Sequence, residues 1–170
     1  IYCLNDPADT LSGLPVTGGT FSGPGMQGNV FNPSGAGAGG PYTISFVVVD
    51  SNQCSDSTSA TTEVNDIPLV ELLGLDTEYC IDDAPAQLTL TPANGGTLTG
   101  SGTNGAFYDP LLAGIGIDSV SYSFTDPVSG CADTVSQVVT VYSLPDPEIT
   151  GDDLICDNET AILELDSNYA

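Results

Sequence analysis

Hydrophobic and polar residues alternate with a period of two along most of the apolar parts of this chain. The longest examples are residues 42–48, Tyr-Thr-Ile-Ser-Phe-Val-Val, and residues 120–124, Val-Ser-Tyr-Ser-Phe. Shorter examples lie at residues 63–64, 87–90 and 139–141. Successive side chains of a β-strand point to opposite faces, so this alternation predicts half-buried strands, with Asp50 and Asp126 ending the two longest.

The pattern occurs twice and begins a third time. Cys80 follows Cys3 by 77 residues (80 − 3), and Cys131 follows Cys54 by the same number (131 − 54). Identical residues recur at this offset, and their first-copy members are Leu11, Pro15, Gly18, Gly19, Thr20, Gly23, Gly25, Pro33, Ala36 and Gly37. A third copy starts at Cys156, 76 residues after Cys80 (156 − 80). Self-similarity at a fixed period predicts a tandem array of a unit of about 77 residues.

Proline-containing joints separate the copies at residues 65–68, Asn-Asp-Ile-Pro, and at residues 143–145, Ser-Leu-Pro. Proline cannot donate to a strand ladder, so it suits the ends of sandwich domains. The predicted domains are 1–67, a repeat that lacks its first strand; 68–144, a complete repeat; and 145–170, the first strands of a truncated third. Because residue 1 lies inside a repeat and the third copy stops soon after its first cysteine, we expect the chain to be a window from a longer protein.

Helices are not expected. No stretch combines a period of 3.6 residues with helix caps, and 20 Gly and 12 Pro punctuate the chain at short intervals. Residues 162–166 have the composition of a helical turn, but their place in the repeat matches the predicted strand at 88–90. The predicted fold class is all-β, built from tandem β-sandwich repeats.

The charge of the chain limits its partners. It has no Lys, Arg or His and carries 23 Asp and Glu residues, which gives a formal net charge of −23. Phosphate neutralisation needs Lys or Arg, so nucleic acid is excluded as a partner, and adsorption to an anionic membrane surface is disfavoured. A hydrophobic fraction of 40% is too high for a disordered chain, and no apolar run is long enough to insert into a membrane.

Five cysteines without metal-ligand spacing indicate disulfides in an oxidising compartment. We expect pairing within each repeat, Cys3 with Cys54 and Cys80 with Cys131, and closing each of these loops should contribute about 4 kcal/mol. In a strict sandwich, however, the two cysteines of one repeat would lie at opposite ends. A staggered link between repeats, Cys3 with Cys131, is therefore the alternative.

Acidic residues follow each joint: Asp76 and Glu78 in the second repeat, and Asp152 and Asp153 in the third. Calcium takes about six to eight oxygen ligands, so acidic joints between sandwich domains would suit it as a stiffening cofactor. The chain has no calcium-loop signature, and Asp also serves solvated turns through local backbone hydrogen bonds. Calcium at these four residues and a chain without a cofactor are both open interpretations.

The order of motifs within the repeat resembles a known family. After the cysteine and an Asp-rich turn come Gly-Gly-Thr-Phe-Ser-Gly-Pro-Gly at 18–25, Phe-Asn-Pro at 31–33, Ala-Gly-x-Gly at 36–39 and Val-Asp-Ser-Asn-Gln-Cys at 49–54. Over the whole chain this series resembles the PKD-like or immunoglobulin-like repeats of very long surface adhesins of Bacteroidota. Gln53 stands where such repeats usually have Gly, which Gly130 restores in the second copy.

The resemblance implies an immunoglobulin-like sandwich for each repeat and a non-catalytic role as a stalk segment at the extracellular bacterial surface. Such adhesins are exported by the type IX secretion system, and gliding-motility adhesins are prominent members. The expected partners are neighbouring repeats of the same polypeptide, with self-association and surface glycans as further options. Asp-Ser/Thr-apolar triplets resemble O-glycosylation sites of exported Bacteroidota proteins, although strand-edge chemistry accounts for them equally well; the acceptors would be Thr10, Ser57, Ser119 and Thr134.

Catalysis is not expected. Without His or Lys the usual general bases are absent, and no Cys or Ser nucleophile has a conventional partner. The adjacent carboxylates at residues 82–83 cannot flank a scissile bond as a glycosidase pair does. Two other functions stay open: a binding or spacer module of a secreted polysaccharide-active enzyme, and a self-assembling filament subunit that uses donor-strand exchange.

Overall fold

The computed structural model describes residues 1–14, 18–147, 149–151 and 163–165. Strands make up 51% of the structure and two short helices make up 6%, so the predicted all-β fold class is confirmed. Within the described ranges, no helix is long and apolar enough to cross a membrane.

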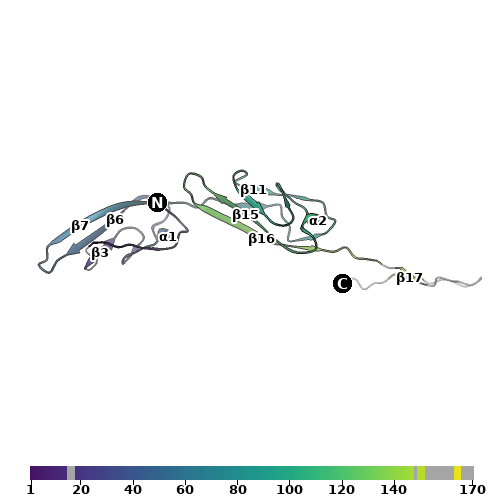
Figure 1. The fold of residues 1–170 in the computed structure, drawn as a ribbon, viewed down its shortest axis with the longest axis horizontal. Helices are drawn as coiled ribbons and strands as arrows, with labels where there is room; N and C mark the ends of the chain where they lie inside the picture. The colour runs from purple at the N-terminus through teal and green to yellow at the C-terminus, as the bar shows by residue number, and fades with distance from the viewer. Residues whose placement is uncertain (15–17, 148, 152–162, 166–170) are drawn as a thin grey trace, which may run out of the picture. The chain divides into compact units, whose positions relative to one another are not determined.

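The first repeat forms two small sheets. Its elements are β1 (Tyr2–Cys3), β2 (Asp9–Thr10), β3 (Gly19–Ser22), β4 (Met26–Gln27), β5 (Val30–Phe31), α1 (Pro33–Ala36), β6 (Gly39–Val49) and β7 (Ser55–Asn65). One sheet has the order β1-β7-β6-β3, and the other has the order β2-β5-β4. The long antiparallel hairpin of β6 and β7 is the largest feature of this repeat, and β3 lies along its free edge (Figure 1).

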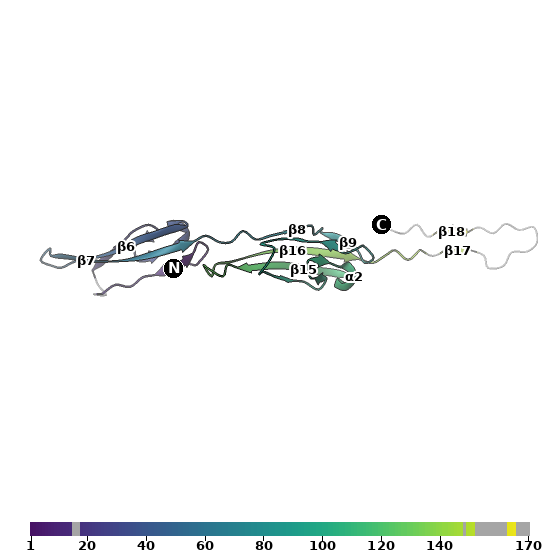
Figure 2. The same cartoon turned by 90° about the horizontal axis from the view of Figure 1, so that it is seen from above.

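The second repeat has the same elements and one additional strand pair. Its elements are β8 (Glu71–Leu73), β9 (Glu78–Cys80), β10 (Ala86–Gln87), β11 (Thr89–Thr91), β12 (Thr97–Thr99), β13 (Thr103–Asn104), β14 (Phe107–Tyr108), α2 (Pro110–Ala113), β15 (Gly116–Thr125) and β16 (Ala132–Tyr142). The sheets have the orders β12-β15-β16-β9, β10-β14-β13 and β11-β8, and β15 lies beside β16 in Figure 2. Two further strands, β17 (Ile149–Gly151) and β18 (Leu163–Leu165), pair with each other, so the predicted strand near residue 164 is confirmed.

The pairing registers of the two repeats agree at the offset found in the sequence. β1 and β7 are parallel with Tyr2 opposite Val64, and β9 and β16 are parallel with Tyr79 opposite Val141, 77 residues later in both strands. The pairs β2–β5 and β4–β5 recur in the same way as β10–β14 and β13–β14. The repetition in sequence is thus also a repetition of strand order and register.

The two helices were not expected from the sequence, and that part of the prediction is wrong. Both are four residues long and begin with proline, Pro33 in α1 and Pro110 in α2. The Asn32 side chain caps α1 by accepting from two backbone N–H groups, and the Asp109 side chain accepts from the N–H of Leu111. An Asn or Asp cap followed by proline is a helix-start signal that would have located both.

The alternating segments bury one face, as predicted. Ile44 and Phe46 of β6 are buried, and so are Val120 and Tyr122 of β15. In the first repeat a core of Phe31, Ile44 and Val64 is packed by partly buried hydrophobic residues, namely Tyr2, Leu4, Leu11, Phe21, Met26, Ala36 and Tyr42. Each repeat therefore has apolar residues at the positions that a sandwich core needs.

The chain divides into two compact units. One comprises Ile1–Leu73, Thr89–Leu98 and Ser121–Ser136, and the other comprises Gly74–Leu88, Thr99–Val120 and Gln137–Ala170. The first unit therefore contains the first repeat together with the part of the second repeat that carries Cys131. This division follows spatial contacts, whereas the boundaries after residues 67 and 144 follow sequence, and those boundaries stay predictions.

Candidate functional site

A disulfide joins the two repeats. It links Cys3 to Cys131, with 5.5 Å between the Cα atoms and 128 residues of sequence separation. The favoured pairings, Cys3 with Cys54 and Cys80 with Cys131, are wrong, and the staggered alternative is confirmed.

The strand register explains why pairing within a repeat fails. Cys3 lies opposite Asn65, whereas Cys54 precedes the first residue of β7 and is 11 residues (65 − 54) before Asn65 on the same extended segment. Eleven residues of strand span about 36 Å, far beyond the ~7 Å that a disulfide allows between Cα atoms. The same geometry separates Cys80, opposite Tyr142, from Cys131.

The remaining described cysteines, Cys54 and Cys80, are free and exposed, whereas Cys131 is fully buried. Cys156 lies outside the described residues. The described part of the chain thus contains one disulfide between repeats and two free thiols. Each free thiol occupies the position that a bonded cysteine has in the other repeat: Cys80 corresponds to Cys3, and Cys54 corresponds to Cys131.

Of the four residues predicted to bind calcium, Asp76 and Glu78 lie in the described part of the chain, and calcium binding at this set stays a prediction. Asp76 and Glu78 are both exposed; the Asp76 N–H donates to the Tyr79 hydroxyl, and the Glu78 carboxylate accepts from the Tyr142 hydroxyl at 3.3 Å. The other two, Asp152 and Asp153, lie outside the described residues. In the described part of the chain, the group of potential ligand atoms that lie within 4.8 Å of one another comes instead from exposed Cys80, Asp82 and Asp83.

The four predicted glycan acceptors, Thr10, Ser57, Ser119 and Thr134, are all exposed, and modification there stays a prediction. In three of the four triplets, those of Ser57, Ser119 and Thr134, the preceding Asp carboxylate accepts from the acceptor's own N–H at 2.8–2.9 Å. This is the local strand-edge bonding that the sequence also allowed.

The aspartate before Ser119 has a larger structural role that the sequence did not reveal. Asp118 is 9% exposed, and its carboxylate accepts from the N–H groups of Ser101, Gly102 and Ser119 at 2.9–3.1 Å. Burial alone would raise the pKa of the Asp118 carboxyl, but these backbone donors together hold it below its ordinary value. Asp118 therefore fixes the loop at residues 100–102 to strand β15.

The hydroxyl of Tyr108 lies close enough to the Asp118 carboxylate to interact with it, but within the described residues it reaches hydrogen-bonding geometry with no group. Its side chain is fully buried. Burial first, and then the charge of Asp118, raise the pKa of Tyr108 to about 12. Phe31 stands at the equivalent position of the first repeat (108 − 77) and carries no hydroxyl.

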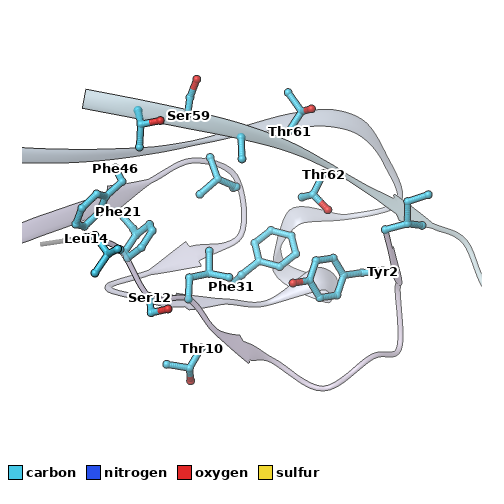
Figure 3. Close-up of a pocket in the computed structure, with 16 residues that line it drawn as sticks. Tyr2, Thr10, Ser12, Leu14, Phe21, Phe31, Phe46, Ser59, Thr61 and Thr62 are labelled. Atoms are coloured by element: carbon cyan, nitrogen blue, oxygen red, sulfur yellow. The ribbon is translucent and has the colours of Figure 1, made fainter. Parts of the chain in front are cut away.

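An open apolar groove of about 980 Å³ runs along the first repeat. Figure 3 shows Leu14, Phe21 and Phe46 gathered at one end and Phe31 with Tyr2 at the other. The aromatic side chains meet in pairs, with ring centroids 4.6 Å apart for Phe21 and Phe46 and 5.0 Å apart for Tyr2 and Phe31. The remaining wall is formed by residues 10–14 and by β7 residues 58–62.

At the equivalent place the second repeat has an additional strand pair. There, β8 pairs with β11, with Leu72 opposite Leu90, and Val70 and Leu72 are buried. The first-repeat counterparts of β11 are residues 12–14 (89 − 77 to 91 − 77), which line the groove, and the counterpart of β8 would precede residue 1. The groove therefore has the position of an edge-strand site.

No family model matches the chain, and the search among curated proteins finds no matching relative.

Proposed function

We propose that this chain is a structural spacer segment of an extracellular bacterial surface adhesin or filament, and that it is not an enzyme. The observation that carries the proposal is the Cys3–Cys131 disulfide between two repeats whose strand registers agree. A covalent bond to a neighbouring domain adds little to the activity of a catalytic or ligand-binding domain. A load-bearing array gains directly, because the bond removes 128 residues of chain from the length that force can extend.

The chemistry of the chain supports this proposal. Disulfides persist in oxidising compartments, which agrees with a location outside the cell. A net charge of −23 without Lys or Arg keeps repeats soluble and mutually repelling, as a surface stalk requires. The order of motifs adds the resemblance to Bacteroidota adhesin repeats, and with it the proposed export by type IX secretion and a role in adhesion or gliding.

Pulling the full chain by its two ends tests the proposal. In the oxidised chain only residues 1–3 and 131–170 can extend, 41 residue steps (2 + 39), which is about 140 Å. Reduction should add the remaining 128 residues, about 450 Å. A chain that releases its full length at the same force before and after reduction would refute the load-bearing role.

A second candidate function, self-assembly by donor-strand exchange, is favoured by the groove. The natural occupant of an edge-strand site is a strand like β8, because the second repeat uses that strand at the equivalent place. The donor would come from another copy of the repeat, through backbone pairing to residues 12–14 and burial of alternate apolar side chains.

A labelled peptide of residues 68–75 tests this candidate against the intact chain. It should bind and should slow amide hydrogen exchange at residues 10–14, whereas the matched peptide with Leu72→Asp should not. Equal binding of both peptides, or binding without protection of residues 10–14, would rule out strand donation at the groove.

A further inference from the structure

The turn at Cys80 has the same backbone hydrogen bonds as the turn at Cys3, which carries the disulfide. The Cys3 N–H donates to the Asp6 carboxylate at 2.7 Å, and the Cys80 N–H donates to the Asp83 carboxylate at 2.7 Å. The return bonds from the Asp N–H to the Cys carbonyl measure 3.0 and 3.1 Å. The residue after each cysteine donates to the last residue of the neighbouring long strand at 2.9 Å in both repeats. The Cys80 thiol is therefore held in the same local frame as a disulfide-forming cysteine.

The hairpin ends at Cys54 and Cys131 share two backbone features. The aspartate that follows the preceding strand donates its N–H to the cysteine carbonyl, at 2.9 Å for Asp50 and 2.8 Å for Asp126. The residue before each cysteine has a positive φ, 68° at Gln53 and 75° at Gly130. A residue other than glycine rarely takes this conformation, so both hairpins hold their cysteine in one specific geometry.

The two hairpins differ by one residue in length, in what covers the sulfur, and in the acceptor of the cysteine N–H, which is the Asp50 carboxylate for Cys54 and the Ser129 hydroxyl for Cys131. Cys131 is fully buried, whereas Cys54 is exposed and borders a hollow of about 410 Å³ that Leu14, Phe46 and Val48 also line. Apolar walls beside a preformed cysteine hairpin are what a second repeat would cover.

We propose that Cys54 and Cys80 are cross-link sites that each take the thiol of another repeat of this kind. Cys80 takes a cysteine equivalent to Cys131, and Cys54 takes a cysteine equivalent to Cys3. Every repeat would then be bonded to both of its neighbours, and the bonds would overlap along the array. This inference deepens the proposed spacer function by naming the partner, but it rests on the pairing seen at Cys3 and Cys131.

Forming each bond removes two electrons and two protons from two thiols. A small disulfide such as oxidised glutathione accepts them: one thiolate attacks it, the second thiolate resolves the mixed disulfide, and two reduced glutathione thiols leave. Bond formation therefore requires only a disulfide oxidant and a neighbouring repeat.

A lengthened chain tests the proposal within one polypeptide. A second copy of residues 68–144 is inserted after residue 144, the protein is oxidised with a glutathione redox buffer, and linked peptides are identified by mass spectrometry. The expected new bond joins Cys80 to the inserted copy's equivalent of Cys131, while Cys3–Cys131 is retained. A bond between the two cysteines of the inserted copy would overturn the proposal.

Mixing two variants tests whether the partner can be a separate chain. One variant, Cys54→Ser with Cys156→Ser, keeps the Cys80 thiol, and the other, Cys80→Ser with Cys156→Ser, keeps the Cys54 thiol. If separate chains pair, the mixed disulfide should exceed each homodimer about tenfold, because only complementary sites dock. A statistical mixture of the three dimers argues against docking between chains and leaves the lengthened chain to decide.

The proposal fails if the lengthened chain leaves Cys80 free or bonds the two cysteines of the inserted copy to each other, whatever the mixture of variants gives. That outcome would not affect the pulling experiment, which depends on Cys3–Cys131 alone. Circular dichroism of each variant, and retention of the Cys3–Cys131 peptide, show that the chains tested are folded.

Discussion

The two repeats use the same strands at the same registers, yet they complete their cores differently. In the second repeat β8 pairs with β11, and Val120 and Tyr122 are at most 1% exposed. In the first repeat the corresponding Ile44 and Phe46 are each 8% exposed and line an open groove. The correspondence follows from packing, because the Phe46 ring covers Gly19 as the Tyr122 ring covers Gly96. The comparison teaches that the two repeats share their interior strands and registers, and that β8 distinguishes the covered face of the second repeat.

The cysteines differ between the repeats in the same sense. Cys3 and Cys131 are bonded to each other, whereas Cys54 and Cys80 have the same local frame without a bond. The differences in disulfide bonding lie at the ends of the repeats, whereas the strand-pairing registers inside the repeats are the same. Among the described residues, the turn around a cysteine therefore does not by itself determine whether that cysteine is bonded.

Removing the bonded cysteine pair should have the largest effect on stability. The double variant Cys3→Ser with Cys131→Ser should lower the free energy of unfolding by about 5 kcal/mol, because a loop of 128 residues is released in the unfolded chain. The matched control, Cys54→Ser with Cys80→Ser, should be nearly neutral. Urea denaturation of both variants measures this, and equal losses would contradict the difference drawn between the two cysteine pairs.

Asp118→Asn should remove a contact that the first repeat lacks. The stretch from the end of the short helix to the end of the following long strand is one residue longer in the first repeat than in the second. Asp118 therefore corresponds to Tyr42 of the first repeat. The Tyr42 hydroxyl donates to the Gly37 carbonyl instead. Loss of the charge that accepts three N–H groups should cost about 2 kcal/mol at neutral pH.

The pH dependence sharpens this prediction. The pKa of Asp118 is lowered in the folded chain, so its contribution is complete above the ordinary value near 3.8 and is lost as the pH falls through the lowered pKa. The asparagine variant should lose less stability than the parent over that acidic range. Asp56→Asn, at an exposed carboxylate that accepts one N–H, is the control and should change little. Identical acid titrations of the parent and Asp118→Asn would exclude this role.

Tyr108→Phe should make the second repeat resemble the first, which has Phe31 at this position. The buried hydroxyl has no hydrogen bond within the described residues, so its removal should stabilise the chain by about 1 kcal/mol. The raised pKa adds a second signature, because the parent should lose stability as the pH rises from about 10 toward about 12, and the variant should lose less. A variant less stable than the parent at neutral pH would show that the hydroxyl has a partner.

Salt should have the smallest effect, and it should differ between the repeats. Residues 68–144 hold nine Asp and Glu side chains, and residues 1–67 hold six, with no Lys or Arg in either. Screening of this repulsion should stabilise the second repeat more, by less than about 1 kcal/mol between low and physiological salt. Hydrogen exchange resolved by repeat would measure the difference, and no response to salt in either repeat would contradict it.

The sequence was sufficient for the strands and their repetition, because both follow from short-range alternation and a fixed offset. It was not sufficient for the disulfide, since the choice of partner depends on β1 lying parallel to the far end of β7, a long-range pairing of two residues per strand. Asp118 was missed for a similar reason. In sequence it is one of several Asp-Ser triplets, and its burial depends on a loop 16 to 17 residues away. For the groove, the sequence predicted only that the first repeat lacks its first strand. It did not predict which residues line the groove.

Cleavage after glutamate in the non-reduced chain tests the central claim most directly. With free thiols blocked first, cutting at Glu63, Glu78 and Glu148 places Cys3 and Cys54 together in fragment 1–63, and Cys80 and Cys131 together in fragment 79–148. The staggered disulfide predicts that these two fragments remain joined until a reductant is added. Two separate fragments, each closed by its own disulfide, would contradict it.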